Sequence, residues 1–221
     1  MIEIDNYISR LKELLKSRFD ARMLYIGLQG SYLRGEATKD SDIDIVVILD
    51  DLTTADLDCY RSIIQSLEYT NKSCGFICGK SELEKWNTLE IHHLLNSTKD
   101  YYGALSELVP NYTMEDVRNH IKLSVNNIYH AICHSYVHGK KEENKATLPM
   151  HYKGTFFILQ NLYYLNHSSF AKTKAELLPL LSGKDHAVLK RSMEFGNGAT
   201  CDFAQDFDLL FTWCQEIMQT I

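Results

Sequence analysis

Residues 27–50 read Gly-Leu-Gln-Gly-Ser-Tyr-Leu-Arg-Gly-Glu-Ala-Thr-Lys-Asp-Ser-Asp-Ile-Asp-Ile-Val-Val-Ile-Leu-Asp. The apolar run that leads into this stretch, residues 24–28, predicts a buried strand. Gly30 then allows the backbone to turn sharply, so that Ser31 opens a short helix. The stretch therefore predicts a strand, a glycine turn and a helix in direct succession.

The start of this short helix is a candidate anion site. Its free backbone N–H groups and the Ser31 hydroxyl would point at a ligand, and a glycine beside them lets a phosphate approach the main chain closely. We therefore expect Gly30 and Ser31 to bind the phosphates of a nucleoside triphosphate.

The second half of the stretch is a strand that carries two carboxylates. Period-2 geometry points Asp42 and Asp44 to one face and the alternating isoleucines, Ile43 and Ile45, to the other. Two like charges about 7 Å apart on one strand face repel each other unless a cation lies between them. Hard oxygen ligands favour Mg²⁺ or Mn²⁺, so we expect Asp42 and Asp44 to hold one of these ions.

Together these residues resemble the motif of the polymerase-beta-like nucleotidyltransferase superfamily, in which Gly-Ser is followed by Asp-x-Asp. Gly30, Ser31, Asp42 and Asp44 fit that motif without a gap, and Arg34 matches an arginine often found three residues after the serine. The resemblance implies transfer of a nucleoside monophosphate from a metal-bound nucleoside triphosphate to a hydroxyl group. It also implies that Arg34 neutralises phosphate charge.

The composition is that of a folded protein, with 45% hydrophobic residues and only 3 prolines. The chain begins without a basic region ahead of an apolar run, and no apolar stretch approaches the length of a membrane span. We therefore expect a cytoplasmic protein with no membrane partner. The 6 cysteines form no Cys-x-x-Cys pair, which favours free thiols over a disulfide framework or structural zinc; they are Cys59, Cys74, Cys78, Cys133, Cys201 and Cys214.

The net charge of −6 lies entirely in the first half of the chain. Residues 1–110 carry 12 Lys and Arg against 18 Asp and Glu, whereas residues 111–221 carry 11 of each. An acidic catalytic half does not suit a protein that grips a polyanionic nucleic acid. We therefore expect the partners to be a nucleoside triphosphate and a small-molecule acceptor.

We expect an α+β fold with a domain boundary at Pro110-Asn111, where mixed patterning gives way to helices alone. Residues 1–110 would form a small mixed-sheet nucleotidyltransferase domain, and residues 111–221 a C-terminal helical bundle that binds a substrate or partner. This domain order resembles that of bacterial antibiotic nucleotidyltransferases, such as those that act on aminoglycosides and lincosamides. In the first half we expect helices at 3–18, 55–69 and 81–86, with further strands at 73–79 and 90–96.

In the second half the apolar spacing predicts a long helix over 114–138 that begins with a capping box. A polar loop over 140–145 would follow, and then an apolar helix that opens with residues 151–153. Residues 173–176 would cap a short helix that Pro179 ends early, and the remaining helices are expected at 185–195 and 202–219.

A third carboxylate, which the resemblance places on the strand after the Asp-x-Asp strand, is missing from the sequence of residues 73–79. Such a group would bind metal or accept the proton of the attacking hydroxyl. Glu90, at the head of the next expected strand, is the nearest substitute, and Asp100 and Glu107 are weaker ones. The second domain could also supply it.

Two further features have both a functional and a structural interpretation. Lys153 could bind the triphosphate from the second domain or could belong to a solvated helix end. His130, His134 and His138 form a stripe at helical spacing, for which surface or interdomain packing is the favoured interpretation; metal binding or contact with the acceptor are the alternatives.

The sequence thus favours a metal-dependent nucleotidyltransferase that modifies a small acceptor, such as an antibiotic. One alternative is an antitoxin-type protein AMP-transferase, which shares the Gly-Ser and Asp-x-Asp motif. Another is a nucleotide-binding protein that has lost catalysis, which the missing third carboxylate would explain.

Overall fold

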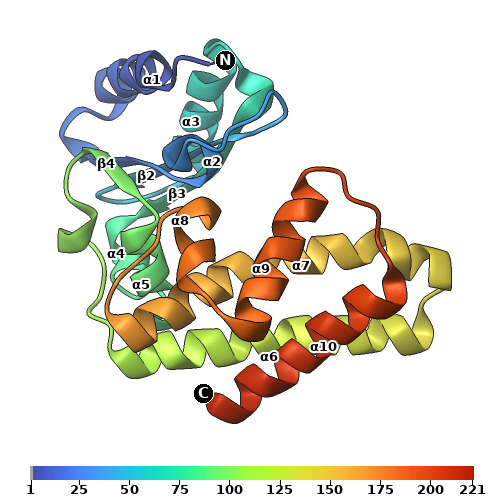
Figure 1. Cartoon of the computed structure of the whole chain (residues 1–221). Coiled ribbons are helices and arrows are strands. Elements are labelled where there is room, and N and C mark those ends of the chain that lie inside the picture. Colours follow the sequence, from blue (N-terminus) through green and yellow to red (C-terminus); the bar gives the residue numbers. More distant parts are fainter. Residues whose placement is uncertain (1) are drawn as a thin grey trace. The chain divides into compact units, whose positions relative to one another are not determined.

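The computed structural model describes residues 2–221 and divides the chain into two compact units, the first ending at Asn111 and the second formed by Tyr112–Ile221 (Figure 1). The first unit is built on a β-sheet with helices, and the second consists of helices and their connections. The α+β fold class predicted from the sequence is confirmed.

A four-stranded mixed sheet forms the centre of the first unit. Its strands lie in the order β3-β2-β1-β4. β1 is antiparallel to both of its neighbours, whereas β2 and β3 are parallel. The strands are β1 (Met23–Leu28), β2 (Ile43–Leu49), β3 (Ser73–Gly79) and β4 (Lys99–Tyr102).

The two faces of the sheet bury different hydrophobic clusters. On one face, Ile43, Ile45, Val47 and Leu49 of β2 belong to a cluster with buried residues of two helices. These helices are α1 (Ile4–Phe19) and α3 (Thr54–Ser66). The intervening residues Val46 and Ile48 belong to a second cluster, together with Tyr25, Cys78, Leu83 and Leu105. By the same alternation, Asp44 lies on the face of Val46.

The shorter helices of the first unit lie in the connections between strands (Figure 1). Helix α2 (Gly30–Arg34) follows β1 directly, as the glycine-serine turn predicts. Helices α4 (Lys80–Leu83) and α5 (Thr88–Asn96) follow β3. Three 3₁₀ turns complete the described part of this unit: η1 (Asp20–Arg22), η2 (Thr70–Lys72) and η3 (Leu105–Glu107).

The expected strand at 90–96 is wrong, because these residues belong to helix α5. The Asn87 side chain accepts a hydrogen bond from Leu89 N–H at 3.1 Å and so caps this helix. Ile91, Leu94 and Leu95 follow the i, i+3, i+4 spacing of a helix face, which the strand interpretation overlooked. The edge strand is instead β4, which begins at Lys99.

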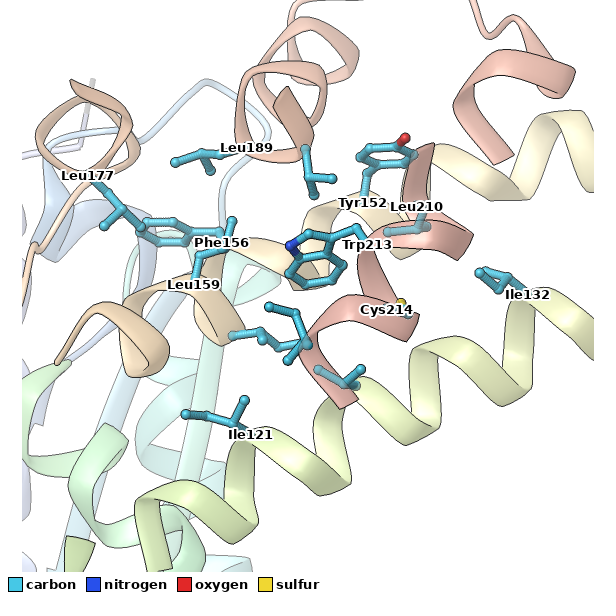
Figure 2. Packing of buried hydrophobic residues seen from close by; sticks show 14 of the residues in the cluster. Ile121, Ile132, Tyr152, Phe156, Leu159, Leu177, Leu189, Leu210, Trp213 and Cys214 are labelled. Atoms are coloured by element: carbon cyan, nitrogen blue, oxygen red, sulfur yellow. The ribbon is translucent and has the colours of Figure 1, made fainter. Parts of the chain in front are cut away.

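The second unit contains five α-helices among the described residues. These are α6 (Met114–His138), α7 (Lys141–His167), α8 (Lys174–Leu177), α9 (Gly183–Gly196) and α10 (Phe203–Thr220), with the 3₁₀ turn η4 (Leu178–Leu180) after α8. Trp213 of α10, Tyr152 and Phe156 of α7, and Leu189 of α9 meet in the core (Figure 2). The Trp213 indole satisfies its N–H by donating to Asp185 Oδ1 at 2.7 Å.

The buried residue Asp206 ties three of these helices together through its carboxylate and its backbone carbonyl. Arg191 of α9 donates two hydrogen bonds to Asp206 of α10, at 2.6 and 2.9 Å. The Tyr152 hydroxyl of α7 donates to the backbone carbonyl of Asp206 at 2.7 Å. Because paired and hydrogen-bonded charges tolerate burial, Asp206 remains in a site where it is only 5% exposed.

The expected polar loop over 140–145 is wrong, because α7 starts at Lys141 and continues through Pro149. Glu142 and Glu143 occupy the first turn of the helix, where negative charge favours helix formation. Asn144 is buried and donates to the carbonyl of Ser135 at 2.6 Å, which ties the start of α7 to the end of α6.

The 6 cysteines are free thiols, of which Cys78 and Cys214 are buried and Cys74 is exposed. Within residues 2–221, no helix has both the length and the apolar character that membrane crossing requires.

Candidate functional site

The glycine turn and the carboxylate strand are packed directly against each other. The backbone N–H of Gln29 donates to the carbonyl of Asp44 at 2.8 Å, which extends the pairing of β1 and β2 to the start of α2. Gly30 has φ +70°, and a Cβ placed there would lie 2.8 Å from Asp44 Cγ and closer still to Oδ2. A side chain at this position would be strained by the backbone and would overlap the carboxylate unless Asp44 shifted.

Helix α2 is a single short turn with Ser31 at its start. It ends at Arg34, and the C-cap residue Gly35 adopts the left-handed conformation with φ +69°. Glu36 N–H donates back to the carbonyl of Ser31 at 2.9 Å. Ser31 is half-buried. The structure therefore places the Gly30-Ser31 turn beside Asp44, as the sequence motif predicts.

The two aspartates lie at the start of β2. Asp42 immediately precedes the strand and is exposed, whereas Asp44 lies within the strand and is half-buried. Their neighbours Ile43 and Ile45 are 0% and 2% exposed. Because these isoleucines fill the core on one face, alternation directs both carboxylates to the other face.

This donor set fits a divalent metal ion of the Mg²⁺ type. Carboxylate oxygens are the ligands such ions prefer, and the pair lies beside the glycine turn at the start of α2. Within residues 2–221, no three or more His, Cys, Asp or Glu side chains are grouped so as to hold a metal ion. The Asp42 and Asp44 pair is therefore a two-carboxylate candidate.

Arg34 is held by an acidic neighbour. Its Nε donates to Glu36 Oε2 at 2.9 Å, and the two side chains are 20% and 32% exposed. A phosphate that approached this guanidinium would share it with Glu36. The sequence motif identified Arg34 but gave no indication of this ion pair.

No carboxylate stands beside Asp44 on strand β3. The parallel register pairs Asp44 with Cys74 and Ile45 with Gly75, so the neighbouring position holds an exposed thiol. Gly75 has φ +118°, and a Cβ there would overlap the backbone of Ile45. The sequence of residues 73–79 contains no acid, and the structure accordingly places none on β3 beside Asp44.

Glu90 does not lie at the head of a strand, and this part of the prediction is wrong. It is an exposed residue in the first turn of α5. Its Oε2 accepts a hydrogen bond from the Trp86 indole N–H at 2.6 Å. Because Glu90 lies in a helix and not in a strand, the alternation of a strand does not direct its side chain toward the proposed metal site.

Asp100 is the acid that the sheet itself presents. In β4, Asp100 pairs with Gly27 of β1, and Gly27 in turn pairs with Val46 of β2. Directly opposed residues of antiparallel strands share a face, so Asp100 lies on the face of Asp44. The neighbouring Tyr101-Tyr102 pair was the available signal for this strand, because aromatic residues favour β-structure.

Tyr25 contacts this acid from β1. Its hydroxyl donates to Asp100 Oδ1 at 2.6 Å. Burial, and then the adjacent Asp100 carboxylate, raise the pKa of the Tyr25 hydroxyl. The hydroxyl therefore stays protonated and holds Asp100 in place at neutral pH.

The remaining candidates belong to the second unit. Lys153 is exposed on α7. His130, His134 and His138 are exposed on α6, with ring centroids 6.1 Å apart for the first pair and 4.9 Å apart for the second.

The family described as nucleotidyltransferase domain matches residues 8–121. Protein adenylyltransferase MntA from Thermococcus cleftensis is 44% identical over 50 residues, which cover 23% of this chain and 48% of that protein. Two provisionally named protein adenylyltransferases of Methanocaldococcus jannaschii are 38% and 34% identical. The first alignment covers 30% of this chain and 64% of the relative, and the second covers 37% and 93%.

A solved structure resembles the chain over nearly its whole length. Spectinomycin adenyltransferase AAD(9) from Enterococcus faecialis, crystallised with ATP and spectinomycin, has a TM-score of 0.60, with 98% of this chain and 99% of that chain covered. The sequence identity is 12%, so the likeness concerns the fold.

Of the three adenylyltransferase relatives, two are matched over less than two thirds of their own length.

Proposed function

The chain belongs to the nucleotidyltransferase domain family, and on that premise we propose that it transfers AMP from ATP to a hydroxyl group of an acceptor, with Mg²⁺ or Mn²⁺ bound. The observation that carries this proposal is the contact between Gly30 and Asp44, which sets a phosphate-accepting turn against a carboxylate pair. The adenylyltransferase names of the relatives support ATP as the donor.

Each part of the site has a role in binding the nucleotide. The backbone N–H groups at the start of α2 and the Ser31 hydroxyl would hold phosphate oxygens. Asp42 and Asp44 would hold the metal ion, which when bound neutralises charge on the phosphates. Arg34 would add a positive charge that it shares with Glu36.

The proposed reaction is a displacement at the α-phosphorus of ATP. The acceptor oxygen forms a bond to that phosphorus, the bond from phosphorus to the oxygen that leads to the β-phosphate breaks, and pyrophosphate leaves. The proton of the acceptor hydroxyl passes to a base. Because no carboxylate lies beside Asp44 on β3, this base has to come from another element.

We propose Asp100, in preference to Glu90, as this base. Asp100 lies on the same sheet face as Asp44 and is held by Tyr25. Glu90 lies on helix α5 and accepts a hydrogen bond from Trp86. Lys153 of the second unit stays a proposed contact of the triphosphate, supported by its charge and exposure.

For the acceptor we propose a small molecule with hydroxyl groups, of the aminoglycoside or lincosamide kind. The acidity of residues 1–110 favours a neutral or cationic acceptor over a nucleic acid. The likeness to a spectinomycin adenyltransferase over both units supports the same choice.

A hydroxyl group on a protein is the second candidate acceptor. The three relatives whose names specify protein adenylylation favour it. The two candidates differ in where the transferred AMP is found, on a small molecule or on a polypeptide.

The test is an incubation with ATP, GTP, CTP and UTP, each labelled on the α-phosphate, in the presence of Mg²⁺ or Mn²⁺. A panel of aminoglycosides, spectinomycin and lincosamides is added in one arm, and cell extract in another. Label on a small acceptor supports the first candidate, and label on a protein supports the second. Tight Mg²⁺-dependent ATP binding without any transfer would instead indicate a protein that only binds nucleotide.

A further inference from the structure

Three histidines line one exposed side of helix α6 at intervals of four residues. His130, His134 and His138 are all exposed, whereas the buried side of the helix carries Val117, Ile121, Val125 and Ile132. The three imidazoles contact one another along the helix, with ring centroids separated by 6.1 and 4.9 Å. The stripe is thus a surface feature of the second unit.

The spacing of the last two rings suits joint coordination of one metal ion. A metal lies about 2.0–2.1 Å from a ligating imidazole nitrogen, and so roughly 3.2 Å from the ring centroid. Two such rings at a tetrahedral angle have centroids about 5.2 Å apart, and at a right angle about 4.5 Å apart. The 4.9 Å between His134 and His138 falls between these values, whereas the 6.1 Å between His130 and His134 exceeds both.

We infer that His134 and His138 form a binding site for a divalent transition-metal ion, Ni²⁺, Cu²⁺ or Zn²⁺, with water or a group from another molecule in the remaining positions. Neutral imidazole is a favoured ligand of these ions, and two residues four apart on a helix present their rings side by side. The site is chemically distinct from the carboxylate pair of the first unit, which suits Mg²⁺ or Mn²⁺.

The position of the pair adds a structural consequence. His138 is the last residue of α6, and Gly139 follows it as the C-cap. A metal ion that joins His134 to His138 would link the final turn of the helix to the preceding one. Binding should therefore slow local opening of this helix end.

The test is a calorimetric titration of the whole chain with Ni²⁺ in excess Mg²⁺, which keeps the carboxylate pair occupied. The variants are His134→Gln and His138→Gln, because glutamine is a good helix former and both positions are exposed. The controls are His130→Gln on the same stripe and His167→Gln, an exposed histidine at the end of α7. Amide hydrogen exchange of residues 135–139 with and without Ni²⁺ gives a second readout.

We expect one Ni²⁺ binding event in the parent chain that weakens about tenfold or more in His134→Gln and in His138→Gln. Both controls should keep it, and exchange at the end of α6 should slow in the parent only when Ni²⁺ is present. The inference is overturned if the parent binds no Ni²⁺, if either pair variant keeps the parent affinity, or if His167→Gln loses as much.

Discussion

Gly30, the first residue of α2, is in contact with Asp44 of β2, with the α-carbon of the glycine packed against the aspartate carboxylate. The contact joins the two halves of the sequence motif. The Gly-Ser turn, which we propose to hold phosphate, packs against Asp44, which we propose to hold metal. It also accounts for the glycine, since a φ of +70° strains any other residue and an added Cβ would overlap the carboxylate.

A pair of alanine substitutions separates these two reasons for glycine. Gly30→Ala and Gly35→Ala both place a Cβ at a φ near +70°, but only the first meets the Asp44 carboxylate, since nothing lies within 4 Å at Gly35. We expect Gly35→Ala to cost about 1 kcal/mol, from the backbone strain alone. Gly30→Ala should cost about 1–3 kcal/mol more, because the overlap forces a shift.

Urea unfolding measures the stability of both variants, and Mg²⁺-dependent ATP binding measures the site. Gly30→Ala should weaken ATP binding strongly, while Gly35→Ala should leave it near that of the parent. Equal affinities and equal stabilities in the two variants would show that the contact with Asp44 has no energetic role.

The carboxylate pair should make ATP binding depend on metal. In the double variant Asp42→Asn with Asp44→Asn, the strand keeps its shape but the site loses its negative charge. We expect ATP affinity to become insensitive to Mg²⁺ and Mn²⁺, as measured by calorimetry with and without the ions. Asp40→Asn, an exposed neighbour, is the control and should retain the dependence. If the double variant binds Mg-ATP as tightly as the parent, the metal assignment is wrong.

The sequence predicted those features that a single local pattern specifies. The turn and strand of residues 27–50, helix α1 and strand β3 were each read from apolar periodicity or from a glycine, and each is confirmed. The core of the second unit was also marked by long apolar stripes, as in helix α6.

Features that depend on tertiary partners were missed. Strand β4 is only four residues long and pairs with β1, and so short a strand was not predicted from its own sequence. Residues 90–96 are a different case, because the helical spacing of Ile91, Leu94 and Leu95 in α5 was present in the sequence and was overlooked. The hydrogen bond from Tyr25 to Asp100 joins residues 75 apart in the chain, which no local pattern reveals.

Ser31 should matter for the nucleotide and little for the fold. It is half-buried at the start of α2, where a bulky side chain would block the approach of a phosphate. We expect Ser31→Leu to lose ATP affinity about tenfold or more, for the one hydrogen bond removed and the space filled. Ser17→Leu, at an exposed helix position, is the control. Parent-like ATP affinity in a folded Ser31→Leu protein would remove the phosphate role from this turn.

Asp56 should make part of the stability depend on pH. Hydrogen bonds from Arg22, and then from Thr53, lower the pKa of this carboxylate in the folded chain. The ionised form therefore stabilises the fold above the unfolded pKa of about 3.9, and the contribution is lost as the pH falls from there toward the lower folded value.

Urea unfolding at pH 7 and at pH 3 tests this sign. Asp56→Asn should destabilise the protein at pH 7, and the difference from the parent should shrink at pH 3. Asp58→Asn, on the same helix with an exposed partner in Arg61, should have little effect at either pH. A deficit in Asp56→Asn that stays constant between the two pH values would argue against a role for its charge.

The base that accepts the proton of the acceptor hydroxyl should be found by neutralising the three candidate acids in turn. General-base assistance is worth about 10²–10⁴-fold in rate, and a residue that acts only in this step leaves ATP binding unchanged. We expect Asp100→Asn to show that loss in turnover, because Asp100 shares the sheet face of Asp44. Glu90→Gln and Glu107→Gln, both at exposed positions outside the strands, should keep most of the activity.

Turnover with the acceptor identified by the labelling panel is the measurement, and ATP affinity is determined for each variant. A loss confined to Glu90→Gln would restore the assignment made from the sequence. Full activity in all three variants would show that none of these acids is the base.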